Sequence, residues 1–94
     1  MSNPGYSIRL RKRARKGLEK LPLIRRQQAR AFINTHLRYT PRQVIPGKTK
    51  RLSGPLKGIY QYDLSDSERI WWCVDDTRRV VEILYVGSHP KVTE

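Results

Sequence analysis

The sequence predicts a single α+β domain: an N-terminal strand, a basic two-helix hairpin and then an antiparallel β-meander. Three observations predict this order. Apolar and polar residues alternate near the N-terminus, two helical stretches follow, and strand-like runs separated by short turns occupy the second half. With 94 residues and 37% hydrophobic content the chain can form one modest core. Residues 1–94 are therefore expected to be one domain, with a flexible tail at residues 1–5.

Two helices are expected between residue 11 and Pro41. Ala14, Leu18 and Leu21 recur at i, i+4 and i+7, which predicts a short helix that ends before Pro22. A second helix starts at Pro22, and Pro41 closes it. The outward faces of both helices are basic. The inward face of the second helix carries Ala29, Phe32, Ile33, His36 and Leu37.

The predicted strands are recognised by period and composition. Residues 6–10 alternate apolar and polar side chains, as a half-buried strand does. Residues 40–58 are rich in Pro and Gly and form a link, with room for a short edge segment at 48–52. Residues 59–64, 69–74 and 80–86 are rich in aromatic and β-branched types and are joined by short polar turns. These short connections predict an antiparallel meander.

A period of two also assigns the meander side chains to the two faces of the sheet. The face expected to cover the helices carries Tyr60, Tyr62, Leu64, Ile70, Trp72 and Val74. The opposite, exposed face carries Gln61, Asp63, Arg69, Trp71 and Cys73. An exposed sheet face with arginine, aspartate and tryptophan in neighbouring strands is a candidate groove, and the last strand brings Tyr85 and His89 to its rim.

Positive charge is concentrated in the first half of the chain. Residues 1–51 contain 15 Lys or Arg and one acidic residue, whereas residues 52–94 contain five basic and seven acidic residues, for a net charge of +12. A charge distribution this uneven creates a positive electrostatic field that attracts polyanions to one surface. Nucleic acid is therefore the first partner to expect, because neutralised phosphates release counterions.

Composition argues against several other classes. A single cysteine, Cys73, cannot form an internal disulfide and fits a reducing cytosol, so a cytoplasmic location is expected. One Cys and two His at unrelated spacing do not resemble a metal cage, so neither a metal nor a cofactor is expected. No stretch approaches the ~18 apolar residues of a membrane span, and no secretory signal is expected.

Five segments carry a family resemblance: LEKLP at 18–22, RLSGPLKG at 51–58, IYQY at 59–62, ERIWW at 68–72 and ILYVGSH at 83–89. In order and spacing they resemble the RelE/ParE superfamily of toxins from type II toxin–antitoxin pairs, with the RelE-type branch favoured. The resemblance implies a β-α-α-β-β-β fold. It also implies a protein that cuts messenger RNA, usually on the ribosome, and is silenced by a co-expressed antitoxin. Members of the ParE branch share the fold but poison DNA gyrase.

RNA cleavage by the 2′-hydroxyl needs a base, a cation at the phosphate and an acid for the leaving oxygen, and none of these requires a metal. Arg69 suits the phosphate, because a planar guanidinium holds two oxygens at once. His89 suits proton transfer, since the ordinary histidine pKa of ~6.5 lies near working pH. Asp63 is either the base or a partner that orients His89. These three residues are the candidate catalytic set.

The other candidate site residues are expected to bind RNA, with the basic surface on the backbone and Trp71 or Tyr85 stacked on a splayed base. The full set is Lys50, Arg51, Lys57, Gln61, Trp71, Tyr85 and Lys91, together with Arg11, Lys12, Arg13, Arg15 and Lys16 in the first helix. Purely structural interpretations stay open. Arg69 can pair with Asp63 across two strands, His89 can be a solvated loop residue, and the helical run can be a solvated face.

The leading interpretation is a ribosome-dependent mRNA interferase that inhibits translation. Its partners are mRNA, the ribosome and an antitoxin, in a hetero-oligomer that can sit on operator DNA. The first alternative is a ParE-like gyrase inhibitor without nuclease chemistry. It is favoured by Gln61 and Asp63, because many RelE-type toxins place two basic residues there. The second alternative is a basic RNA- or ribosome-binding protein whose binding fades with salt.

Overall fold

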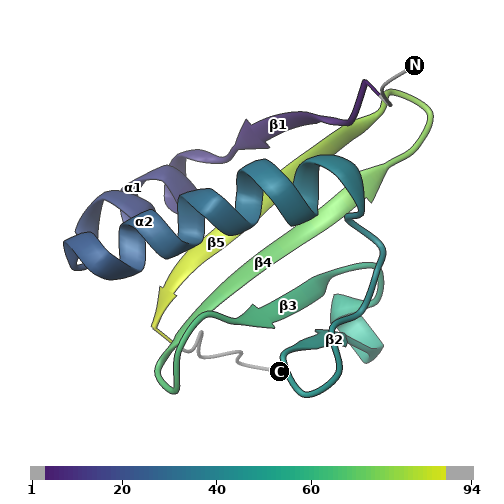
Figure 1. The fold of residues 1–94 in the computed structure, drawn as a ribbon. Coiled ribbons are helices and arrows are strands. Elements are labelled where there is room, and N and C mark those ends of the chain that lie inside the picture. The colour runs from purple at the N-terminus through teal and green to yellow at the C-terminus, as the bar shows by residue number, and fades with distance from the viewer. Residues whose placement is uncertain (1–3, 89–94) are drawn as a thin grey trace.

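The computed structural model describes residues 4–88, in which two helices pack on one face of a five-stranded mixed sheet (Figure 1). The sheet order is β1-β5-β4-β3-β2. The strands are β1 (Ser7–Leu10), β2 (Thr49–Arg51), β3 (Tyr60–Asp63), β4 (Glu68–Asp75) and β5 (Val80–Ser88). The predicted α+β class and the antiparallel meander are confirmed, and β2 fills the place left for an edge segment.

The first strand, β1, lies at one edge of the sheet beside the last strand, β5. β1 pairs in parallel with β5, with Ile8 opposite Val81 and Leu10 opposite Ile83. Parallel neighbours need a long crossover, and here the helical hairpin, β2, β3 and β4 all lie between the two strands in sequence. The last strand therefore lies between β1 and β4, in the interior of the sheet.

The helices are α1 (Lys12–Lys20) and α2 (Leu23–Phe32), separated at Pro22 as expected. A π-helical turn, η1 (Ile33–Leu37), continues α2 and was not predicted. Buried side chains follow the predicted apolar faces: Ala14 and Leu18 in α1, and Ala29, Phe32, Ile33 and Leu37 in α2 and η1. The pattern of apolar residues thus placed the helices correctly, although periodicity could not foresee the wider last turn.

Aromatic side chains fill the core between the helices and the sheet. Trp72 is fully buried, and its indole N–H donates to the carbonyl of Pro41 at 3.0 Å. The Phe32 ring stacks on Tyr62 with centroids 3.8 Å apart and meets Trp72 edge-on at 5.7 Å. Ile70 is also fully buried, and burial of such a side chain contributes about 1.5–3 kcal/mol. This packing orients the opposite face of β3 and β4 toward solvent.

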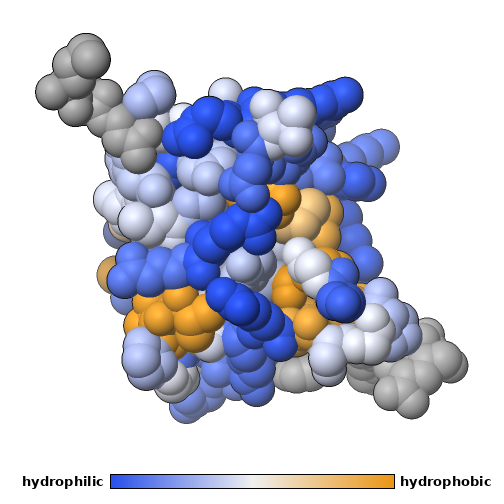
Figure 2. All heavy atoms as spheres, turned by 90° about the vertical axis from the view of Figure 1, so that its right-hand side faces the viewer, coloured by the Kyte–Doolittle hydropathy of each residue, from blue (hydrophilic) through white to orange (hydrophobic). Residues whose placement is uncertain are grey.

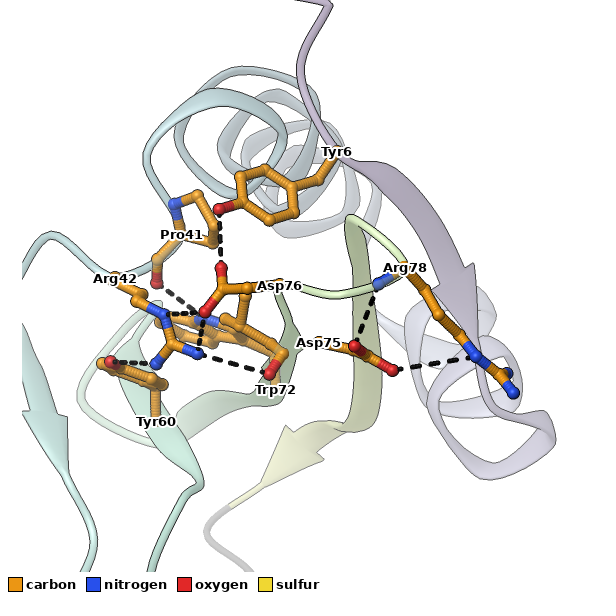
Figure 3. A network of polar contacts seen from close by, with 9 residues as sticks. Tyr6, Pro41, Arg42, Tyr60, Trp72, Asp75, Asp76 and Arg78 are labelled. Carbon is orange, nitrogen blue, oxygen red and sulfur yellow. Dashed lines mark hydrogen bonds and ion pairs between the residues drawn. The ribbon is translucent and has the colours of Figure 1, made fainter.

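A polar cluster, the Arg42–Asp76 clamp, joins the ends of four segments (Figure 3). It comprises Tyr6, Arg42, Tyr60 and Asp76. Arg42 Nη2 lies 2.6 Å from Asp76 Oδ2, and its Nη1 donates to the Tyr60 hydroxyl at 3.3 Å. The Tyr6 hydroxyl donates to Asp76 Oδ1 at 2.8 Å. The clamp therefore ties the N-terminal segment, the link after α2 and the β4–β5 turn together.

The clamp also shifts the ionisation of its members. Hydrogen bonds from Arg42 and then Tyr6 lower the pKa of Asp76. The hydrogen bond to Asp76, with desolvation second, raises the pKa of Tyr6, and the bond to Asp76 raises that of Arg42. Each shift favours the protonation state that makes the cluster's contacts.

The surface is largely polar. Figure 2 turns the right-hand end of Figure 1 toward the viewer, and hydrophilic residues cover most of it, with hydrophobic residues in separate patches. Leu23 and Ile24, at the start of α2, are the most exposed large apolar side chains of the described residues, at 63% and 59%. No helix within residues 4–88 has the length and apolar character that crossing a membrane demands.

Candidate functional site

The residues predicted on the exposed sheet face do lie together, on the face away from the helices. Gln61 pairs with Trp71 and Asp63 with Arg69 in the β3–β4 register, so the four side chains form two adjacent rows. We call Gln61, Asp63, Arg69 and Trp71 the open-face cluster. Alternation of side chains brings them together, because each is two positions from the next on its strand.

Asp63 and Arg69 form an ion pair, with Arg69 Nε 3.1 Å from Asp63 Oδ1. Their side chains are 28% and 14% exposed. The contact lacks hydrogen-bond alignment, because Nε is buried without an acceptor among the described residues, so the attraction is electrostatic. Arg69 Nη1 donates to the carbonyls of Ser65 at 2.7 Å and Glu68 at 3.1 Å. The guanidinium is thus fixed in place against the β3–β4 turn.

Gln61 lies deeper than expected for a residue of the exposed face. It is 5% exposed, and its amide is held between two neighbours. Trp71 Nε1 donates to Gln61 Oε1 at 2.9 Å, and Gln61 Nε2 donates to Asp63 Oδ1 at 3.3 Å. A buried polar group with both ends bonded is satisfied, and little of its surface is left for RNA. The open-face cluster is therefore a continuous chain of polar contacts from Trp71 to Arg69.

Tyr85 reaches the same face through an irregularity in β5. Trp71 pairs with Tyr85 but Trp72 pairs with Ile83, so Leu84 is an extra residue, a β-bulge, on β5. The Tyr85 ring lies 6.1 Å from Trp71, and the Arg13 guanidinium lies over it at 4.6 Å. Its hydroxyl donates to the Ser88 carbonyl at 2.5 Å. Tyr85 therefore links the cluster, helix α1 and the end of β5.

A basic cleft of about 860 Å³ lies between α1 and the end of β5. Glycine makes the close approach possible: a Cβ on Gly17 would lie 1.7 Å from the Val86 carbonyl oxygen. Arg69 and Gly87 are register partners, so the open-face cluster is next to this cleft. The cleft is lined by Lys12, Arg13, Lys16, Gly17, Lys20, Leu21, Pro22, Ser67, Glu68, Tyr85, Val86, Gly87 and Ser88. Four cations on an apolar floor suit a phosphate backbone.

The structure separates the basic residues at 11–16 that were predicted together. Lys12, Arg13 and Lys16 line the cleft, whereas Arg11 pairs with Glu82 at 3.0 Å and Arg15 is exposed outside it. Lys20 lines the cleft too and was missed. The signal was available, because Lys20 follows Lys16 by four positions and so lies on the same side of the helix.

The remaining predicted RNA-binding residues lie on β2 and beyond it. Lys50 is exposed and pairs in register with Gln61, so it borders the open-face cluster. Arg51 lies over the Tyr60 ring at 5.8 Å, on the side of the sheet that the helices cover. Lys57 is exposed in the link. His89 and Lys91 lie outside the described residues.

The cysteine and the arrangement of possible metal ligands bear on two other kinds of chemistry. Burial, with Glu82 second, raises the pKa of the Cys73 thiol, which disfavours a reactive thiolate. Within residues 4–88 no three His, Cys, Asp or Glu side chains are grouped so that they could hold a metal ion. The arrangement instead offers a carboxylate, a fixed guanidinium, aromatic rings and a basic cleft, which together suit a nucleic-acid backbone.

Comparison with solved structures relates this arrangement to toxin–antitoxin systems. The RelBE2 toxin–antitoxin complex from Mycobacterium tuberculosis has a chain 27% identical to this one, with a TM-score of 0.76 over 90% of this chain and 99% of that one. A chain of the intact E. coli RelBE complex is 25% identical, with a TM-score of 0.71 over 92% of this chain and 99% of that one. A YoeB/ParE toxin from Agrobacterium tumefaciens is 16% identical, with a TM-score of 0.77 over 89% of this chain and 99% of that one.

These likenesses concern the whole fold and not a short motif. No family model matches the sequence, and no curated protein matches it. The solved structures nevertheless match about nine-tenths of the chain, through both helices and the sheet. The chain therefore has a RelE-like fold, and a solved YoeB/ParE toxin shares that fold.

Proposed function

We propose that this protein is the toxin of a toxin–antitoxin pair and acts as an endoribonuclease on messenger RNA. The observation that carries the proposal is the fixed Asp63–Arg69 pair beside a basic cleft. Support for the toxin role comes from neighbours that are themselves toxins in complex with antitoxins. The site would act in the cytoplasm, where mRNA and ribosomes are found.

The proposed reaction is transfer of the phosphoryl group to the ribose 2′-oxygen. Asp63 takes the proton from the 2′-hydroxyl, and the freed oxygen attacks the phosphorus. Arg69 stabilises the charge that grows on the phosphate oxygens. The bond to the 5′-oxygen breaks and His89 protonates that oxygen, leaving a 2′,3′-cyclic phosphate and a free 5′-hydroxyl. Gln61 Nε2 and Arg69 Nε both contact Asp63 Oδ1, so we assign the proton to Oδ2.

Binding and chemistry are assigned to neighbouring parts of the surface. The Asp63–Arg69 pair has no net charge, so it attracts a phosphate less than a lone arginine does. The cleft supplies that attraction through Lys12, Lys16 and Lys20. The ribosome, as second partner, would hold the mRNA in the reactive geometry, a contribution worth many orders of magnitude in effective concentration.

The proposal is tested by inducing the gene in bacteria and mapping the 5′ ends of an abundant mRNA minutes later. We expect new ends within the reading frame for the unaltered protein and none for Arg69→Ala or His89→Ala. Growth arrest with intact mRNA would overturn the nuclease. Co-expression of an acidic antitoxin from the neighbouring gene should restore growth, because it would cover the positive surface of the hairpin or the open face.

One observation favours a second candidate, inhibition of DNA gyrase without chemistry. Arg69 is occupied by Asp63 and two backbone carbonyls, and Gln61 is neutral, so the open face is less cationic than a phosphate site needs to be. A gyrase inhibitor would arrest growth, leave mRNA intact and induce a DNA-damage response. A plain RNA-binding protein would cause no arrest at all.

A further inference from the structure

Gln61 lies between Trp71 and Asp63, two members of the open-face cluster with opposite hydrogen-bonding capacity. The Trp71 indole can only donate a hydrogen bond, and the Asp63 carboxylate can only accept. A primary amide has one accepting and one donating end, so Trp71 fixes its orientation with Oε1 toward the indole at 2.9 Å. Nε2 must then point to Asp63 Oδ1, at 3.3 Å. The orientation of the amide follows from its neighbours.

A lysine at this position would not serve the same purpose. Lysine has donors alone, so it would leave Trp71 Nε1 without an acceptor, and it would add a second cation beside Asp63. Gln61 and Trp71 are register partners on adjacent strands, and the side chain of Gln61 is 5% exposed. The hydrogen bond between Trp71 and Gln61 is therefore fixed by the pairing of β3 and β4 and is present before any substrate binds.

We propose that Gln61 is a positioning residue for Asp63 and that Trp71 acts through Gln61. This inference rests on the proposed function, in which Asp63 is the base. Gln61 Nε2 and Arg69 Nε both contact Oδ1, and in this proposal Oδ2 takes the proton of the 2′-hydroxyl. Trp71 contributes its indole N–H rather than a stacking surface. Both residues were predicted to bind RNA, and this proposal gives them a role at the carboxylate.

The test is single-turnover cleavage of an mRNA on programmed ribosomes. The variants are Gln61→Met, which keeps the volume but no hydrogen bond, Trp71→Phe, which keeps a ring but no N–H, and the double variant. We expect Gln61→Met to lower the rate at saturating substrate about tenfold to a hundredfold, because a small displacement of a reacting group is that costly. The half-saturating concentration should not change. Trp71→Phe should have a smaller effect, and the double variant should match Gln61→Met alone.

The control is Cys73→Ala, on the same face of β4 but outside the cluster, and thermal unfolding of every variant checks the fold. An unchanged rate in a folded Gln61→Met protein would overturn the inference. So would an increased half-saturating concentration at full rate, which indicates RNA contact. Multiplying effects of the two substitutions would show that Trp71 acts independently. Absence of cleavage by the unaltered protein would instead refute the proposed function itself, and the positioning role with it.

Discussion

The molecule contains two aspartate–arginine pairs whose surroundings differ. In the Arg42–Asp76 clamp the closest atoms are 2.6 Å apart, although both side chains are about half exposed. In the open-face cluster Asp63 and Arg69 are 3.1 Å apart and much more buried. The clamp joins segments that are far apart in the sequence, and two tyrosine hydroxyls complete it. The pair on β3 and β4 joins strands that already pair through their backbones.

This difference indicates what each pair is for. The clamp stabilises the arrangement of chain segments, although the exposure of both side chains makes it a modest contribution. The Asp63–Arg69 pair is not needed to bring β3 and β4 together, and burial of its charges costs free energy. We infer that its position, and not its contribution to stability, accounts for its presence. Substitutions at the two pairs should therefore affect different properties.

The largest expected effect is on activity, at Arg69. Arg69→Ala should reduce mRNA cleavage about a hundredfold to a thousandfold, as loss of a group that stabilises transition-state charge does. Arg42→Ala is the matched control. It should cleave normally but unfold at a lower temperature, because Asp76 and Tyr60 lose their shared partner. Cleavage rates and thermal unfolding of both variants provide the measurement. Normal cleavage by Arg69→Ala together with lost cleavage by Arg42→Ala would contradict the comparison.

An intermediate effect is expected at Gly17, where the site region depends on close packing. The new Cβ in Gly17→Ala would lie 1.7 Å from the Val86 carbonyl oxygen, so α1 must move away from β5. Overpacking of this kind costs about 1–3 kcal/mol, more than the gain of about 1 kcal/mol in helix propensity. Denaturant unfolding should show the loss, and a filter-binding assay should show weaker RNA retention.

Glu19→Ala, on an exposed position of the same helix, is the control for Gly17→Ala and should leave both properties nearly unchanged. A Gly17→Ala protein as stable as the unaltered one would mean that α1 and β5 are not in the close contact described here.

The smallest expected effect is the pH dependence of the clamp. Because Arg42 and Tyr6 lower the pKa of Asp76, folding gains stability above the unfolded value of about 3.8 and loses it as pH falls through the folded value. Asp76→Asn should therefore be less stable than the unaltered protein at pH 7, and the difference should shrink below about pH 4. Thermal unfolding at several pH values measures it. A difference that stays constant from pH 7 to pH 3 would contradict the assigned pairing.

Features with a short sequence period could be predicted, and features that depend on distant contacts could not. Alternation placed Asp63 and Arg69 on the face opposite Trp72, and helical spacing placed Leu18 and Phe32 in the core. Parallel pairing of β1 with β5 depends on residues far apart in sequence and has no local signal. The same is true of the cleft at Gly17, which looks in the sequence like an ordinary weak point in a helix.

The sequence predicted which side chains share the open face of β3 and β4 but not the contacts between them. Gln61 was expected to contact RNA from the exposed face, whereas the structure buries it between Trp71 and Asp63. Arg11 was grouped with the RNA-binding run, whereas it pairs with Glu82 across the edge of the sheet. Such partners are chosen by register and by the bulge at Leu84, and a period of two does not specify either.

The central claim, that Asp63 is a catalytic base and Asp76 a structural partner, is tested most directly by comparing Asp63→Asn with Asp76→Asn. The measurement is single-turnover cleavage of mRNA on programmed ribosomes by the two purified variants and the unaltered protein. The account predicts a loss of about 10²–10⁴-fold for Asp63→Asn, as removal of a general base causes, and a nearly unchanged rate for Asp76→Asn. Equal cleavage by a folded Asp63→Asn protein would contradict it.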